Sequence, residues 1–186
     1  MSFPSDLPEP KDDGACAHLT NATIPSVPLA ATSGSSVDIS SLSGLTVVFC
    51  YPRTGAPNET IADAWNEIPG ARGCTPQACS FRDASKEFQE LGVSNIFGLS
   101  TQDTAYQKEV HGRLHLPYQL LSDEKLEFAQ ALRLPLFEWE GRKLIKRMSM
   151  AVVDGRIVRV WYPVFPPDKS ADEVLRWLRI ERQGVS

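Results

Sequence analysis

Several features that mark particular classes of protein are missing from this sequence of 186 residues. No apolar run approaches the roughly 20 residues that a membrane-spanning helix needs. Lysine and arginine form no basic stripe and the net charge is −4, so we expect neither nucleic acid nor a membrane as a partner. The N-terminus has neither the basic start nor the apolar core of a signal peptide. A cytoplasmic location is therefore the expectation.

Cysteine is scarce as well, with four residues in the chain. Cys16 and Cys50 are isolated and show no zinc-finger spacing, and His111 and His115 have no third ligand nearby. We therefore expect no metal and treat both histidines as surface residues. A chain of this length with 42% hydrophobic residues can bury a core without disulfide bonds. In a reducing compartment, paired cysteines are more often catalytic or metal-binding than structural.

The remaining pattern alternates strands with helices. Residues 45–51, LTVVFCY, are nearly all apolar and β-branched or aromatic, which is typical of a strand buried on both faces. A helix over 75–92 separates it from a second core strand that ends at Ser100, and this order makes a βαβ unit. The pattern then predicts a helix over 104–116, a strand over 118–123, a helix over 124–134, two strands around an Asp154-Gly155 turn and a helix over 170–180.

This order predicts an α/β protein with a thioredoxin-like fold, in which helices flank a central mixed β-sheet. Residues 1–20 are rich in Pro, Asp and Ser and lack periodicity, so we expect an irregular N-terminal arm. Residues 21–186 are predicted to form one domain. The fold by itself does not determine the function.

Two cysteines lie close together in the segment GCTPQACSFRD. Cys74 is predicted at the start of a helix that Thr75 caps and Pro76 begins, where unpaired N–H groups and the helix dipole stabilise a thiolate. Cys79 lies five positions later, about 7.5 Å along the axis and turned by about 140°. The intact helix would keep the two sulfurs apart. Cys79 is either a second redox thiol or a small core residue.

The segment GCTPQACSFRD resembles the active-site segment of the peroxiredoxins, and in particular of the Q-type, or bacterioferritin-comigratory, subgroup. Four further segments match the family in the same order: VVFCYP, LGVSNIFGLSTQD, LPYQLLSDEKLEFAQAL and RMSMAVVDGRI. The resemblance extends from about residue 24 to the end of the chain. A helix that starts with Gly-Cys-Thr and has a second cysteine five residues after the first is a specific signature.

The resemblance implies a thiol peroxidase that needs no metal or organic cofactor. Cys74 matches the peroxidatic cysteine, whose thiolate attacks hydrogen peroxide or an alkyl hydroperoxide and becomes a sulfenic acid. Cys79 matches the resolving cysteine, which attacks the sulfenic acid after local unwinding. Arg147 matches the arginine that stabilises the thiolate and the peroxide oxygens. Thioredoxin or glutaredoxin is the expected reductant, and the protein is expected to be a monomer or a homodimer.

One departure from the family pattern affects the site. The family proline lies seven residues before the cysteine, but Pro52 lies 22 residues before Cys74, with an insert over 54–68 between them. Ala71 occupies the position of the usual hydroxyl. That hydroxyl is supplied by Thr54, which we favour, or by Thr75, or it is absent.

The other residues of this segment are assigned less specifically. Pro69 is predicted to shield the thiolate, and together with Gly73 and Thr75 it is a candidate for substrate binding. The insert is predicted to be a surface excursion beside the active site, because long loops are usually functional or disordered. Arg72 is either an additional positive charge near the thiol or a solvated loop residue.

Three other functions remain open from the residues. A single-cysteine peroxidase would be resolved by an external thiol, and a thioredoxin-fold redox sensor would be oxidised without turnover. A thioredoxin-type disulfide reductase would need Cys-x-x-Cys, whereas four residues separate Cys74 from Cys79.

Overall fold

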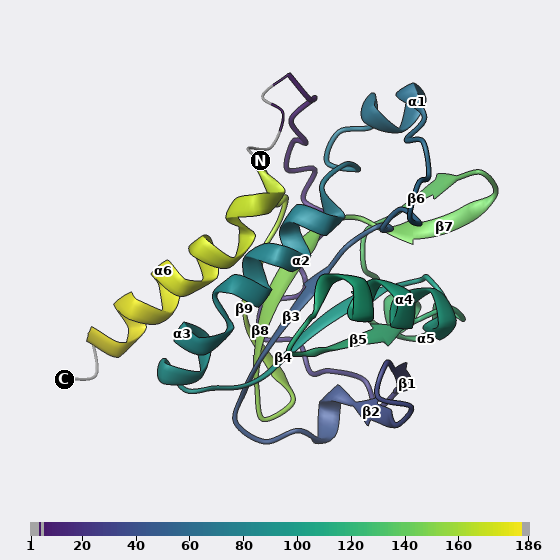
Figure 1. The fold of residues 1–186 in the computed structure, drawn as a ribbon. Coiled ribbons are helices and arrows are strands. Elements are labelled where there is room, and N and C mark those ends of the chain that lie inside the picture. The colour runs from purple at the N-terminus through teal and green to yellow at the C-terminus, as the bar shows by residue number, and fades with distance from the viewer. Residues whose placement is uncertain (1–3, 5, 184–186) are drawn as a thin grey trace.

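A seven-stranded mixed sheet forms the centre of the protein (Figure 1). The structure is a computed structural model, and it describes residue 4 and residues 6–183. The strand order is β2-β1-β5-β4-β3-β8-β9. The bounds are β1 Pro28–Ala31, β2 Ser36–Asp38, β3 Leu45–Cys50, β4 Val93–Ser100, β5 Gln119–Ser122, β8 Met148–Val153 and β9 Arg156–Trp161. The predicted thioredoxin-like fold with a mixed central sheet is confirmed.

Strand β3 lies at the middle of this sheet, parallel to β4 and antiparallel to β8. Its side chains alternate between two apolar cores, with Val47 and Phe49 in one and Val48 and Cys50 in the other. A strand buried on both faces must be apolar at every position, which explains the continuous run in the sequence.

Helices cover the two faces of the sheet unequally (Figure 1). Four helices pack on the face that contains Phe49: α2 Cys74–Asp83, α3 Ser85–Glu90, α4 Thr104–Leu114 and α6 Ser170–Gln183. Phe49 stacks on Phe81 of α2 with ring centroids 4.5 Å apart, and Phe81 stacks on Phe88 of α3 at 5.6 Å. Helix α5 Glu127–Leu132 contributes to the core on the opposite face. Helix α2 is thus fixed to the sheet by aromatic packing.

Three sequence predictions about helices and strands were wrong in detail. The helix expected over 75–92 is two helices, because the chain leaves helical geometry around Ala84 (φ −90°, ψ −1°). The pair Ser170 and Glu173 predicts a capping box at the start of the last helix, but Ser170 is not a cap, since it has helical dihedrals and its hydroxyl is used inside the core. A second small sheet, the hairpin of β6 Leu136–Trp139 and β7 Arg142–Ile145, was not predicted as a separate element.

The described part of the N-terminal segment contains turns but no regular element. It is nevertheless attached to the body, because Cys16 and Leu19 are buried in the core and Asp13 bonds to Lys146 and to the Tyr162 hydroxyl. The domain boundary at residue 20 stays a prediction.

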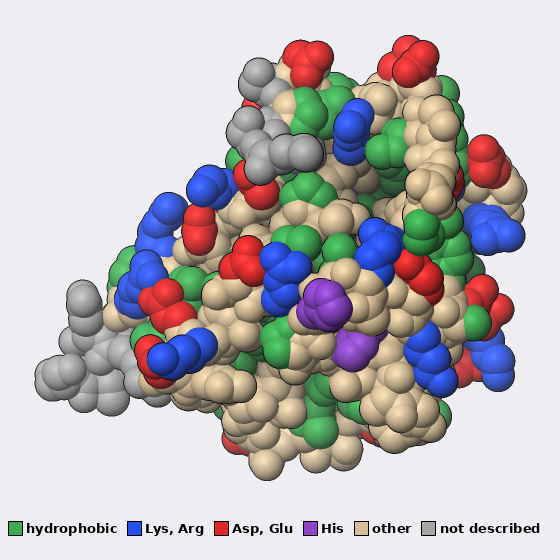
Figure 2. All heavy atoms as spheres, in the orientation of Figure 1, with side chains coloured by type: hydrophobic (Ala, Val, Ile, Leu, Met, Phe, Trp, Pro, Cys, Tyr) green, Lys and Arg blue, Asp and Glu red, His purple; other side chains and the backbone are tan. Residues whose placement is uncertain are grey.

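Charged side chains of both signs are mixed over the face that Figure 2 shows, with no basic stripe. Among the residues that the structure describes, no helix combines the length and the apolar character needed to cross a membrane.

Candidate active site

Glycine determines how helix α2 begins. Gly73 precedes the helix with φ +111°, a left-handed conformation that residues with a Cβ rarely adopt. Cys74 is therefore the first helical residue, so its predicted place at the start of the helix is confirmed, although the helix begins earlier than Pro76, where the sequence predicts its first residue. The predicted cap is wrong, because no side chain caps the helix and Thr75 and Pro76 lie within its first turn. The free N–H groups of this turn thus have no side-chain acceptor from the cap position.

The thiol of Cys74 lies against the guanidinium of Arg147. Arg147 Nη2 is 3.2 Å from Cys74 Sγ, and Sγ is 3.7 Å from the carbonyl oxygen of Ala71. The two side chains are almost completely buried, with exposed fractions of 4% and 3%. The guanidinium is therefore close enough to donate a charge-assisted hydrogen bond to the sulfur. The structure thus brings together the two residues that the sequence placed 73 positions apart.

Arg147 lies directly before strand β8 and is held by neutral groups. Its Nε donates to the carbonyl of Gly70 at 3.2 Å, its Nη1 to Gln77 Oε1 at 2.6 Å and its Nη2 to the carbonyl of Ala71 at 2.9 Å. None of the ion pairs between described residues includes Arg147. Its positive charge is therefore directed at the sulfur and is not neutralised by a carboxylate.

Gln77 is a site residue that the sequence reasoning missed. It is fully buried, its Oε1 accepts from Arg147, and its Nε2 donates to Ser170 Oγ at 3.3 Å. Ser170 Oγ lies 3.1 Å from Ser149 Oγ. The available signal was the spacing, because a residue three positions after Cys74 lies on the same face of the helix.

A cavity of about 410 Å³ opens over Cys74. Thr54, Gly73 and Thr75 line it together with Cys74, as the sequence predicts, and so does Arg72. Pro69 does not. It is exposed and lines a separate cavity of about 360 Å³ on the other side of Arg147. The predicted role of Pro69 in shielding the thiol stays a prediction.

Thr54 is buried, and Gln102 fixes its position. Its backbone N–H donates to Gln102 Oε1 at 2.9 Å, its hydroxyl donates to the same oxygen at 3.2 Å, and its carbonyl accepts from Gln102 Nε2 at 3.1 Å. The hydroxyl proton is thus directed away from Cys74, while the oxygen lone pairs remain available as acceptors. Thr54 as the replacement for the usual hydroxyl stays a prediction.

The insert over 54–68 lies beside this cavity, as predicted. Residues 56–64 are exposed, and helix α1 Asp63–Asn66 carries the buried Trp65 into the cavity wall. Trp65 packs edge-on against Trp139 of the β6–β7 hairpin at 5.2 Å, and the Arg53 guanidinium lies 5.6 Å from the Trp65 ring. The insert and the hairpin therefore form one wall of the site.

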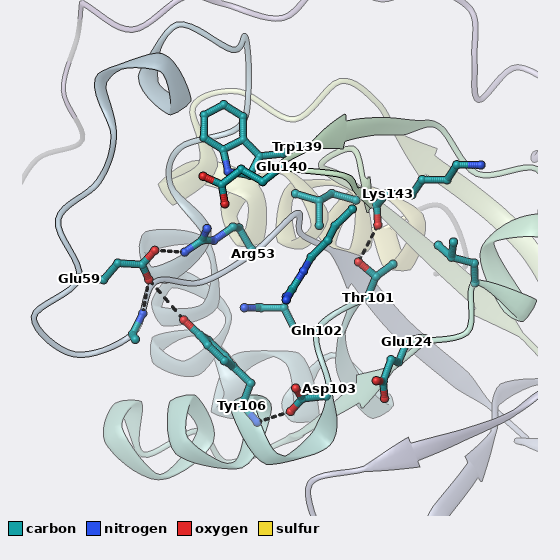
Figure 3. A pocket seen from close by; sticks show the side chains of 14 residues that line it. Arg53, Glu59, Thr101, Gln102, Asp103, Tyr106, Glu124, Trp139, Glu140 and Lys143 are labelled. Carbon is teal, nitrogen blue, oxygen red and sulfur yellow. Dashed lines mark hydrogen bonds and ion pairs between the residues drawn. The ribbon is translucent and has the colours of Figure 1, made fainter.

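A second cavity, of about 510 Å³, adjoins the first (Figure 3). The two cavities share Arg53, Glu59, Trp139 and Glu140. Glu59 lies at their junction, where it pairs with Arg53 and accepts from the Tyr106 hydroxyl at 3.4 Å (Figure 3).

Cys79 has different surroundings from Cys74, although both lie on α2. It is half-buried, and its nearest charged groups are Arg82, Asp83 and Arg113. Burial raises the pKa of the Cys79 thiol above its usual value, and Arg82 offsets this only in part. Cys79 is therefore a thiol at neutral pH while the helix is folded.

Comparisons with known proteins agree with this geometry. The family model described as Redoxin matches residues 19–175. A peroxiredoxin of Mycobacterium tuberculosis is 30% identical over 76% of this chain and 82% of its own length. This chain belongs to the peroxiredoxins. It is a thiol-dependent peroxidase with its two helical cysteines, Cys74 and Cys79, on one helix.

Other relatives place this peroxiredoxin in the Q-type group. The chloroplastic peroxiredoxin Q of Gentiana triflora is 28% identical over 96% of this chain and 77% of its own length. That of Suaeda salsa is 31% identical over 78% of this chain, which spans only 61% of the length of that relative.

Solved structures support the same assignment. The peroxidoxin BcpB of Mycobacterium tuberculosis superimposes with a TM-score of 0.70 at 27% identity, covering 87% of this chain and 96% of that chain. The bacterioferritin comigratory protein of Xanthomonas campestris has a TM-score of 0.66 at 19% identity over 95% of this chain and 99% of its own, which supports the fold alone.

Proposed function

We propose that Cys74 is the peroxidatic residue of this peroxiredoxin. Its thiolate attacks the terminal oxygen of a hydroperoxide ROOH, the O–O bond breaks, and RO⁻ leaves and takes up a proton as ROH. The sulfur is oxidised to Cys74–SOH and the peroxide is reduced. The observation that carries this proposal is the 3.2 Å contact between Arg147 Nη2 and Cys74 Sγ at the floor of a cavity.

Arg147 and the first turn of α2 stabilise the charge in this reaction. The guanidinium offsets the negative charge of the thiolate and the charge that develops on the peroxide oxygens. Gln77 is a positioning residue, because it holds Arg147 Nη1 from the same helix that carries the thiol. Thr54 contributes its free lone pairs, which can accept the O–H of the peroxide.

Cys79 is proposed to resolve the sulfenic acid within the same chain. Its thiolate attacks Cys74 Sγ, a disulfide forms, and the hydroxyl leaves as water after taking up a proton. The first turns of α2 must open for this step, because five helical positions separate the sulfurs by about 7.5 Å along the axis. Opening breaks the Gln77–Arg147 bond and exposes the buried Ala78. A dithiol then reduces the disulfide and is itself oxidised.

Thioredoxin or glutaredoxin is proposed as this dithiol, and a monomer or homodimer as the active form. The cytoplasmic location, an antioxidant role and the Cys74–Cys79 disulfide likewise remain proposals.

A second candidate is a peroxidase whose sulfenic acid is resolved by an external thiol. The environment of Cys79 favours it, since this thiol is half-buried and its pKa is raised.

One assay separates the two candidates. Peroxide consumption is followed for the wild type and Cys79→Ser, with thioredoxin and its reductase, with glutaredoxin, or with glutathione alone. Intramolecular resolution predicts turnover of the wild type with a dithiol system and its loss in Cys79→Ser. Equal turnover of both proteins with glutathione would identify the external-thiol peroxidase. Failure of the wild type to consume peroxide with any reductant would exclude both.

A further inference from the structure

The cavity over Cys74 is much larger than the smallest peroxide requires. Hydrogen peroxide has two heavy atoms, so it takes up about the space of two water molecules, or roughly 60 Å³ of liquid volume. The cavity measures about 410 Å³. A substrate that reaches the sulfur with its O–O group therefore has room for a substituent of several carbon atoms.

Arg53, Glu59, Arg72 and Glu140 line parts of this cavity, but the cavity also has one apolar wall that the substituent can contact. This wall consists of Ile61, Ala62 and Trp65 from the insert and Trp139 from the β6–β7 hairpin. Ile61 is 44% exposed, and it is one of three exposed large hydrophobic residues in the described part of the chain. The other two, Val158 and Ile180, line none of the three cavities described here. An exposed isoleucine that continues an apolar cavity wall provides a surface for an apolar ligand.

This wall is held in place before any substrate binds. Glu59 ties the insert to its surroundings by accepting from the backbone N–H of Ala56 at 2.8 Å and by its contacts with Arg53 and Tyr106 (Figure 3). Trp65 is only 7% exposed and packs on Trp139. A preformed wall costs little ordering entropy on binding. The seven-residue spacing between proline and cysteine in the family pattern leaves no room for such an insert, so the wall is a property of this chain.

The adjoining cavity is different in character. Arg142, Lys143 and Glu124 line it but not the Cys74 cavity (Figure 3). Arg53, Glu59 and Glu140 line both cavities, whereas Ile61, Ala62 and Trp65 line only the Cys74 cavity. An apolar group therefore meets Ile61 and Trp65 only in the Cys74 cavity.

We infer that this peroxiredoxin prefers organic hydroperoxides with a compact, uncharged apolar group over hydrogen peroxide, and that Ile61 is a specificity-determining residue. The inference rests on the proposed function of Cys74. The –OOH group lies at Cys74 and Arg147, and the apolar group lies on Ile61 and Trp65. The reaction is the one given above, with ROH as the alcohol product.

Values of kcat/KM for cumene hydroperoxide and hydrogen peroxide, measured with dithiothreitol as the reductant, test this inference. The ratio of the two values should exceed one in the wild type and fall about tenfold in Ile61→Ser, because the loss of one or two apolar groups from a binding wall has an effect of that size. Ile61→Leu should restore most of the ratio. Ile180→Ser, which removes an even more exposed isoleucine from α6, should keep the wild-type ratio.

An Ile61→Ser ratio equal to that of Ile180→Ser, with both peroxides still reduced, would overturn the inference and leave the proposed function standing. A wild-type ratio below one would overturn it in the same way. If the wild type reduces neither peroxide, the proposed function fails as well.

Discussion

The two cysteines of helix α2 lie five residues apart but have opposite environments. Cys74 is buried against a guanidinium that no carboxylate neutralises, at the floor of a cavity. Cys79 is half-buried, and burial raises the pKa of its thiol. Both cysteines belong to the same helix, so the difference between their environments arises from the groups that the fold places next to each side chain. We therefore propose that Cys74 reacts while the helix is folded and that Cys79 reacts only when the helix opens.

The largest effect is expected from removing the thiol at the prepared end. Cys74→Ser should lower the rate of peroxide consumption by at least about 1000-fold, because the nucleophile itself is lost. Cys79→Ser should keep the first oxidation at close to the wild-type rate. Stopped-flow fluorescence after mixing with one equivalent of hydrogen peroxide measures this step. A Cys74→Ser variant that still reacts rapidly would show that the reactive thiol has been misassigned.

The next effect concerns the cation beside Cys74. Arg147→Ala should slow the first oxidation roughly 10- to 150-fold, since hydrogen bonds to a charged group contribute about 1.5–3 kcal/mol. Arg82, at the other end of α2, provides the matched control. It pairs with Asp83 and donates to the Leu114 carbonyl, so Arg82→Ala should change the rate less than about twofold. Equal effects of the two substitutions would argue that general positive charge, and not the contact with Sγ, activates Cys74.

A smaller effect is expected from the glutamine between the two cysteines. Gln77→Leu leaves Arg147 Nη1 without its buried acceptor, which should lower the free energy of unfolding by about 1–3 kcal/mol. Ser80→Ala removes a hydrogen bond of similar length, 2.8 Å, from a half-buried position, and should cost less than about 1 kcal/mol. Urea denaturation of both variants measures the difference. Identical stabilities would show that the Gln77–Arg147 bond does not fasten α2.

The smallest effect is a shift in the pH dependence of alkylation at the Cys79 thiol. Its pKa is raised in the folded protein, so the folded chain retains a proton that the unfolded chain has released. Folding stability contributed by this group is present below the unfolded pKa of about 8.5 and is lost as the pH rises through the folded pKa. In Cys74→Ser, the midpoint for alkylation of the Cys79 peptide by iodoacetamide should lie at a higher pH in the folded protein than in urea, where it should be about 8.5. Equal midpoints in both conditions would contradict the raised pKa.

The sequence predicted the central elements because their signals are local. The apolar run over 45–51 and the helix start at Cys74 depend on neighbouring residues and on the sheet environment they imply. Sequence reasoning does not identify contacts that depend on how distant segments pack together. Pro69 was predicted from its place in the sequence to shield the thiol, and that role stays a prediction, because Pro69 lines a separate cavity together with Arg147. Gln77 has no distinguishing local signal, and only the fold brings Arg147 to it.

The hairpin of β6 and β7 was missed for a related reason. Its two four-residue strands form a separate sheet and pack on the insert through Trp139 and Trp65, a contact between segments 74 positions apart. The packing of α2 also limits how much of this helix can unwind. Phe81 is fully buried in a stack between Phe49 and Phe88, so opening must be confined to the turns before it.

Peptide mapping after a single oxidation tests the division of roles most directly. Wild-type protein treated with one equivalent of hydrogen peroxide, alkylated and digested under non-reducing conditions should yield a peptide with a Cys74–Cys79 disulfide within one chain, with Cys16 and Cys50 alkylated after denaturation. Cys79→Ser should instead carry one added oxygen on Cys74. A disulfide between two chains, a bond from Cys74 to Cys16 or Cys50, or first oxidation at Cys79 would contradict the account.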